Sequence, residues 1–273
     1  MKRILAVFIA LCLCLALAAC AGNPLPSESG TSSSAPMEKK TVYVQLTAKT
    51  ISRVGDEETV NSIITNVYDD QGVLVSRTYQ YDTSWTYTAE NDAYGRVTRL
   101  TCTISSGTAV MEYTYDQQGN VLSIIASQDG VAVQTEQNTY DADGNLLTHE
   151  LIAGDYNSKE VYTYQQGKVT KKELYRDGTL SQYEVYNYDD QGRILSRETH
   201  LENGALWATS EYTYSEDGLT TYINCEKYKL SSVEVRDANG NLLRTESIDA
   251  GGGSITEYTY QAIEIPRNYP RQN

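Results

Sequence analysis

Apolar and polar residues alternate along most of the chain after residue 40, and short turn-forming segments interrupt the alternation at regular intervals. Pairs such as Tyr113 with Tyr115 and Tyr186 with Tyr188 flank one polar residue, which places both rings on the same face of a strand. A second apolar stretch, such as Leu146-Leu147, follows each turn. No segment beyond residue 19 shows convincing helical periodicity. The pattern predicts an all-β fold.

The turns are copies of one motif, in which a tyrosine and an aspartate usually precede a glycine. The glycines are spaced 23, 24, 25, 23, 25, 26 and 22 residues apart. They are Gly72, Gly95, Gly119, Gly144, Gly167, Gly192, Gly218 and Gly240. Aspartate can cap its own turn, and glycine adopts the positive φ that a tight turn requires. Second turns such as Asp129-Gly130 and Asn203-Gly204 lie midway and are typical of hairpins.

Each repeat is therefore expected to be a hairpin of two strands, and the repeats together form roughly 16 strands in one antiparallel meander. At about 4.8 Å per strand, such a sheet extends for about 75 Å, and open sheets rarely exceed about 10 strands without curling. We expect one long twisted or curled sheet with atypical ends. Thr41 to Ile51 and Thr256 to Ile265 are the expected caps.

The N-terminus has the pattern of a secretory signal. Lys2 and Arg3 precede an apolar run that ends at Ala19 and, at about 16 residues, is short for a membrane-spanning helix. Leu17-Ala18-Ala19-Cys20 resembles the lipobox of bacterial lipoproteins, which implies cleavage before Cys20 and lipidation of its thiol. The alternative is a secreted protein with a chance cysteine at the cleavage site. The implied location is the bacterial cell envelope, lipid-anchored outside the cytoplasm, in an envelope of one membrane or two.

These features divide the chain into four segments. Residues 1–19 are the signal peptide, and residues 20–40 are the lipidated cysteine with a linker rich in Ser, Pro and Gly. Residues 41–266 form the repeat domain, and residues 267–273 are a C-terminal tail.

The chain is strongly acidic. Its formal charge is −14, and loss of Lys2 and Arg3 without any acid brings the mature chain to −16. This charge argues against nucleic acid as a partner, and against docking onto anionic lipid, and it permits a cationic partner. Asp141-x-Asp143-Gly144 resembles a fragment of a calcium loop, but the remaining oxygen ligands are missing and turn geometry explains the residues. We expect no metal and no cofactor.

The repeat Tyr-x-Tyr-Asp-x-x-Gly-[Asn/Arg]-[Leu/Val] resembles the YD repeat of Rhs and teneurin-type proteins, over about residues 60–260. The resemblance implies a long β-sheet that spirals, in some members into a shell around a toxin. The chain has neither the Asp-Pro-x-Gly self-cleavage signature nor a toxin domain, and its eight units are far fewer than a closed shell needs. The resemblance therefore does not imply toxin delivery.

Tyrosine dominates the aromatic residues. The chain has 23 tyrosines, and its one phenylalanine, Phe8, lies in the signal. Rings with a polar tip suit a thinly covered sheet, and they also suit a platform that stacks sugar rings or contacts a protein. If the platform exists, Trp85, Tyr87 and Trp207 are its candidate ligand-binding residues. Trp85 lies where the mid-repeat turn is poorly marked, which allows an irregular exposed loop.

Catalytic chemistry has little support in the sequence. His149 and His200 are two repeats apart, which separates them by roughly 20 Å in the sheet. No serine-hydrolase, zinc-protease or phosphate-loop signature is present, so we assign no catalytic residue. Cys102 and Cys225, about five repeats apart, are expected to be two free, buried thiols rather than a disulfide.

The sequence favours a non-catalytic, lipid-anchored binding or scaffold protein of the cell surface. Its ligand would be a glycan, a cell-wall component or a protein. The alternative is a lipoprotein that neutralises or escorts a toxin, which the Rhs-like repeat and the acidity suggest. A third interpretation is a passive spacer without a specific ligand.

Overall fold

The structure is a computed structural model that describes residues 39–54, 57–249 and 252–266. The predicted signal peptide, Cys20 and the C-terminal tail lie outside the described residues. Almost all described residues lie in strands, apart from turns and the 3-10 helix η1 (Glu226–Tyr228). No helix in this part of the chain is long and apolar enough to cross a membrane. The strands are β1 (Lys39–Val54), β2 (Glu57–Tyr68), β3 (Leu74–Gln80), β4 (Ser84–Asn91), β5 (Val97–Ile104), β6 (Gly107–Tyr115), β7 (Val121–Gln128), β8 (Val131–Tyr140), β9 (Leu146–Ala153), β10 (Tyr156–Gln165), β11 (Lys168–Arg176), β12 (Thr179–Tyr188), β13 (Ile194–Leu201), β14 (Leu206–Tyr214), β15 (Thr220–Cys225), β16 (Leu230–Arg236), β17 (Leu242–Asp249) and β18 (Gly252–Pro266).

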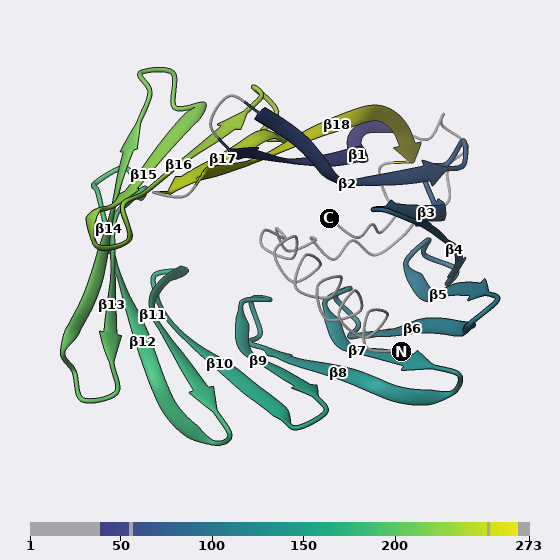
Figure 1. Cartoon of the computed structure of the whole chain (residues 1–273), viewed down its shortest axis with the longest axis horizontal. Coiled ribbons are helices and arrows are strands. Elements are labelled where there is room, and N and C mark those ends of the chain that lie inside the picture. Colours follow the sequence, from purple (N-terminus) through teal and green to yellow (C-terminus); the bar gives the residue numbers. More distant parts are fainter. Residues whose placement is uncertain (1–38, 55–56, 250–251, 267–273) are drawn as a thin grey trace, which may run out of the picture.

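The 18 strands form one closed antiparallel barrel (Figure 1). Each strand pairs with its neighbours in sequence, and β18 also pairs with β1, for example between Thr47 and Thr259. The all-β prediction is confirmed, and the strands follow the predicted antiparallel meander, whereas the expected long curled sheet with separate, atypical ends is wrong, because the sheet closes. Thr41 to Ile51 and Thr256 to Ile265 are not caps, because they pair with each other. This pairing satisfies the backbone N–H and C=O groups that an open sheet leaves at its edges.

The eight repeats supply β2 to β17, and β1 and β18 add the two strands that close the barrel. All eight motif turns lie at one end, because each joins an even-numbered strand to the next odd-numbered strand. We call this end the acidic rim. Its turns contain Asp69, Asp92, Asp116, Asp141, Gln166, Asp189, Ser215 and Asp237.

The turn at Asp189 shows why aspartate and glycine recur. The Asp189 Oδ1 accepts hydrogen bonds from the backbone N–H of Gln191 at 3.0 Å and of Arg193 at 2.8 Å. Gly192 has a φ of +83° and donates its N–H to the Asp189 carbonyl at 2.9 Å. The same side-chain contacts recur at Asp69, Asp92, Asp116, Asp141 and Asp237. The prediction that aspartate caps its own turn is confirmed.

Tyrosines bind six of the eight motif hairpins to the strand that precedes them. The Tyr115 hydroxyl, at the end of β6, donates to the Val97 carbonyl at the start of β5, at 2.6 Å. The equivalent contacts are Tyr68–Gln45, Tyr140–Val121, Tyr164–Leu146, Tyr188–Val169 and Tyr214–Ile194. A register shift accompanies the motif in seven of the eight hairpins, as between Thr114 and Tyr115. Such bulges increase local twist, which favours closure of the sheet.

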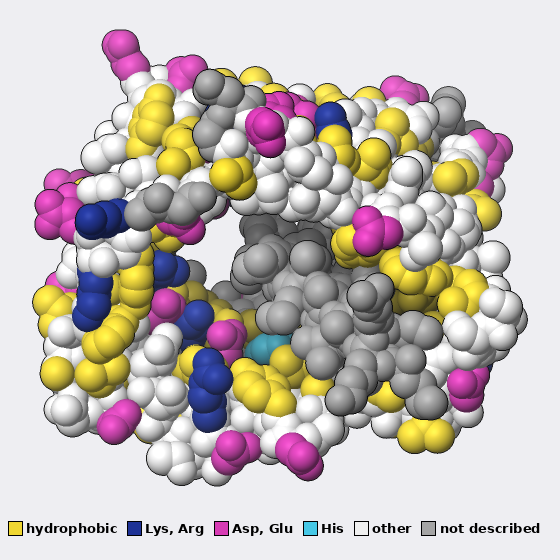
Figure 2. Space-filling view, viewed as in Figure 1, with side chains coloured by type: hydrophobic (Ala, Val, Ile, Leu, Met, Phe, Trp, Pro, Cys, Tyr) yellow, Lys and Arg dark blue, Asp and Glu magenta, His cyan; other side chains and the backbone are white. Residues whose placement is uncertain are grey.

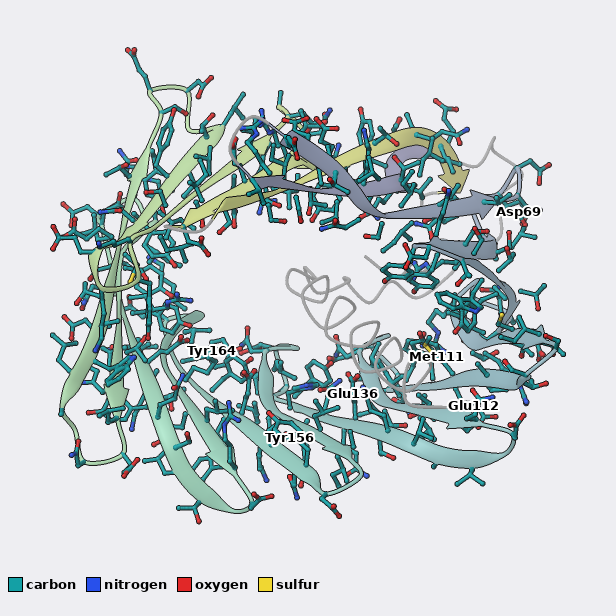
Figure 3. The ribbon with its side chains drawn as sticks, viewed as in Figure 1. Asp69, Met111, Glu112, Glu136, Tyr156 and Tyr164 are labelled. Carbon is teal, nitrogen blue, oxygen red and sulfur yellow. The ribbon has the colours of Figure 1, made fainter. Side chains whose placement is uncertain are left out.

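The two faces of the barrel wall can be assigned from β6. Met111 points into the barrel and Glu112, its neighbour, points outward (Figure 3). Because side chains alternate along a strand and paired residues share a face, the strand register extends this assignment around the barrel. The outer face includes the hydroxyl pairs Thr78–Thr86, Thr114–Ser123 and Thr139–Thr148.

Candidate functional site

The inner face of the strands from β3 to β7 is apolar. Leu100, Met111 and Ala126 pair across β5, β6 and β7, and each is at most 1% exposed. On the neighbouring strands the rings of Tyr79 and Tyr87 meet edge to face, with centroids 5.7 Å apart. We call the buried set the apolar arc. It consists of Leu74, Tyr79, Tyr87, Val97, Leu100, Cys102, Ala109, Met111 and Ala126.

One cation lies within the apolar arc. Arg77 is an inner residue of β3 that pairs with Asn66 on β2 and Tyr87 on β4. Its Nε donates to the Asn66 Oδ1 at 2.7 Å, and the Tyr79 hydroxyl is a second neutral partner. Burial opposes the charge, but the surrounding tyrosine hydroxyls outweigh it, so the pKa of Arg77 lies above its ordinary value. Among the described residues Arg77 forms no ion pair.

The inner face of β10 to β14 carries a row of charges instead. Lys172 Nζ lies 3.4 Å from Glu160 Oε1 and 3.1 Å from Glu184 Oε2. Arg197 Nη1 lies 3.7 Å from Glu184 Oε1, and its Nη2 lies 3.4 Å from Ser210 Oγ. We call these five residues, one from each consecutive strand, the polar arc. Each cation in this row has a carboxylate beside it.

A tyrosine hydroxyl fixes the charge states within the polar arc. Tyr186 donates to the Glu184 Oε2 at 2.6 Å. Burial raises the pKa of Tyr186, and the adjacent Glu184 carboxylate raises it further. Burial also opposes the Glu184 charge, but Tyr186, Lys172 and Arg197 outweigh it and hold the Glu184 pKa below its usual range. At neutral pH Glu184 is charged and Tyr186 is a neutral donor.

The polar arc borders an opening through the barrel. Figure 2, which looks down the barrel, shows basic and acidic side chains beside this opening, over β10 to β13. The Lys172 side chain is 24% exposed and that of Arg197 is 36% exposed. Polar groups of the arc are therefore within reach of water.

The structure places the predicted residues Trp85 and Tyr87 inside the barrel. Both lie in β4 rather than in a loop, on the same face as Met111. Tyr87 is 5% exposed and belongs to the apolar arc. Trp85 is half-buried against that arc and lies near Tyr81, with ring centroids 6.0 Å apart. The two residues share a face as predicted, and they pack against the wall.

Trp207, by contrast, is exposed at the rim opposite the acidic rim. It is 41% exposed and is the extra residue of a bulge between β13 and β14. Its indole N–H donates to the Tyr228 hydroxyl of η1, and Lys227 Nζ lies 3.2 Å from the centroid of its ring. Tyr228 is 51% exposed and Leu206 is 58% exposed. We call Leu206, Trp207, Lys227 and Tyr228 the aromatic cluster.

The two tryptophans are not brought together, because β4 and β14 lie on opposite sides of the barrel (Figure 1). The sequence-based prediction did not include Lys227 and Tyr228 as partners of Trp207. The signal was available: the Glu226–Tyr228 segment replaces the Asp-Gly or Asn-Gly turn that other repeats place there. No sequence feature pointed to Arg77, because the absence of an acidic partner beside it among the described residues can be seen only in the folded structure.

The histidines and cysteines of the described residues do not form a common site. His149 is an inner residue of β9, and His200 on β13 stacks on Tyr183 at a centroid distance of 4.8 Å. Across the described ranges, no group of three or more His, Cys, Asp and Glu side chains is arranged to hold a metal ion. Cys102 and Cys225 are free and buried, as predicted.

Comparisons with known proteins give limited information. A family model described as an uncharacterised protein matches residues 56–187. No curated protein matches the chain. A porin-like protein from Bacteroides uniformis is 8% identical, with 80% of this chain and 98% of that chain covered and a TM-score of 0.44. TcdB2-TccC3 without its hypervariable C-terminal region is 12% identical, with 76% and 14% covered and a TM-score of 0.28. At these TM-scores neither likeness defines a shared fold.

Proposed function

We propose that the chain is a non-catalytic, lipid-anchored binding or scaffold protein of the bacterial cell surface, and that the aromatic cluster contacts its ligand. The ligand is a glycan, a cell-wall component or a protein. The observation that carries the proposal is the exposed Trp207 ring, held in place by Tyr228 and Lys227. Exposed aromatic groups are costly in water and are enriched at the centres of binding surfaces. A fixed ring also loses little freedom when a ligand binds.

The position of the aromatic cluster suits an anchored protein. β1 runs from the acidic rim, because it is antiparallel to β2, which ends there. The aromatic cluster lies at the start of β14, at the opposite rim, which is the rim farther from the start of β1, the strand that follows the proposed anchor.

A capture experiment tests this proposal. The purified chain is incubated with isolated cell walls and a glycan panel at low and high salt. We expect capture that resists salt, is lost in Trp207→Ala and persists in Tyr222→Ala. Tyr222 is a matched control, because it is 48% exposed on neighbouring β15 but lies outside the cluster. Equal capture of both variants would contradict the role of the aromatic cluster, and no capture by the parent chain would exclude a glycan or cell-wall ligand and leave a protein as the ligand.

A second candidate function has support from the acidic rim. Aspartates in neighbouring turns give this end a concentration of negative charge, and a shallow depression of about 490 Å³ lies between the turns at Asp116 and Asp141. Such a surface suits a basic protein, as in a lipoprotein that neutralises or escorts a toxin. The YD-repeat resemblance belongs to this second proposal. Binding of a basic partner would weaken steeply with salt and would not depend on Trp207.

A further inference from the structure

Arg77 differs from the inner-facing cations of the polar arc. Lys172 and Arg197 each lie beside Glu184, at 3.1 and 3.7 Å. Arg77 has neutral partners, Asn66 and Tyr79, and the described residues offer it no carboxylate. A guanidinium withdrawn from water without an anion is unfavourable, and such groups are enriched at functional sites.

The surroundings of Arg77 are apolar and aromatic. Arg77 itself is half-buried, and so are the inner residues Ile64, Tyr68, Trp85 and Tyr113. These side chains pack against the apolar arc and form its lumen-facing border. A single fixed charge within an apolar, aromatic lining is the usual composition of a site for a small amphipathic molecule.

We infer that the inner face around Arg77 binds an apolar monoanion, a long-chain carboxylate. Its head contacts the Arg77 guanidinium, and its chain lies along the half-buried residues that border the apolar arc, Ile64, Trp85 and Tyr113. Charge complementarity selects an anion, because Arg77 is the cation of this face and has no acidic partner among the described residues. The planar guanidinium matches a carboxylate through two parallel hydrogen bonds. The apolar lining selects a ligand with a hydrocarbon body.

Titration of the purified full chain with sodium laurate tests the inference, with dodecanol and inorganic phosphate as probes for the chain alone and the anion alone. We expect saturable laurate binding and at least about tenfold weaker binding of either probe. Dodecanol lacks the anionic head, and phosphate lacks the hydrocarbon chain. Arg77→Met should weaken laurate binding about tenfold or more, and Arg77→Lys should retain part of it. Arg99→Met is the matched control, because Arg99 lies on the outer face of β5, 3.3 Å from Glu112.

Thermal unfolding separates a binding role from a structural one. Laurate should raise the unfolding midpoint of the parent chain and of Arg99→Met, but not that of Arg77→Met. Without laurate, Arg77→Met should unfold at the same or a higher temperature than the parent chain, because it removes an unpaired cation. No laurate binding, or unchanged binding in Arg77→Met, would overturn the inference. Trp207→Ala should leave laurate binding unchanged, which distinguishes this site from the aromatic cluster.

Discussion

The apolar arc and the polar arc are built on the same repeat but differ in what lines the barrel. Tyr115, beside the apolar arc, and Tyr188, beside the polar arc, donate to carbonyls one strand away at 2.6 and 2.7 Å. The turns at Asp92 and Asp189 also have the same hydrogen bonds. Inner positions of the strands differ: Met111 occupies one wall and Glu184 the other. The motif therefore determines the wall, and the inner positions differ between its two sides.

The largest expected effect is in the apolar arc. Met111→Ala should lower the free energy of unfolding by about 3 kcal/mol, because Met111 is fully buried and its truncation leaves a cavity. Met111→Leu, which nearly conserves volume, should cost less than about 1.5 kcal/mol. Urea unfolding monitored by tyrosine and tryptophan fluorescence measures both. Equal small effects of the two variants would show that this face is not close-packed.

A smaller effect is expected in the polar arc. Glu184→Gln should cost about 2 kcal/mol, because it removes the charge that Lys172 and Arg197 face while those cations stay half-buried. The double variant Glu184→Leu with Arg197→Met should be less destabilised than Glu184→Leu alone, because it also removes the cation that loses its carboxylate, whereas Lys172 keeps Glu160. The same urea titration gives these values. Additive losses in the double variant would contradict the account of a coupled charge row.

The tyrosine contacts should contribute equally on both sides of the comparison. Tyr115→Phe and Tyr188→Phe each remove one hydroxyl donor and should each cost about 1 kcal/mol. Paired unfolding curves of the two variants give the difference directly. A difference of more than about 1 kcal/mol would show that the lining, rather than the motif, determines the strength of the wall.

The acidic turns give the smallest effect, visible as a dependence on pH. The backbone N–H of Arg193, with its guanidinium, holds the pKa of Asp189 below its usual range. A carboxyl whose pKa is lower in the folded state stabilises the fold above its unfolded pKa of about 4, and this contribution is lost as pH falls through the folded pKa. Asp189→Asn should therefore lose less stability than the parent chain between pH 5 and pH 2.5, as thermal midpoints measured across that range would show. An identical pH profile would contradict this origin.

Local features were predictable from sequence, and long-range features were not. The Tyr113–Tyr115 alternation and the aspartate turns each depend on a few consecutive residues, so strands, hairpins and caps follow from them. Closure depends on pairing between β1 and β18, at opposite ends of the chain, and no residue within either strand specifies that partner. The site divides in the same way. Trp207 was named as a candidate from its residue type, whereas the neutral surroundings of Arg77 appear only when β2, β3 and β4 are adjacent.

Cross-linking of β1 to β18 tests the closed barrel most directly. Thr47 and Thr259 pair across these strands, with hydroxyl oxygens 2.6 Å apart on exposed positions. Paired residues in antiparallel strands lie about 4.5–5.5 Å apart at Cα, within the range of a disulfide. Under mild oxidation, Thr47→Cys with Thr259→Cys should form an intramolecular disulfide, whereas Thr47→Cys with Thr148→Cys on β9 should not. Efficient cross-linking of the first pair alone is the result expected for a closed barrel, and failure of that pair to cross-link would contradict closure.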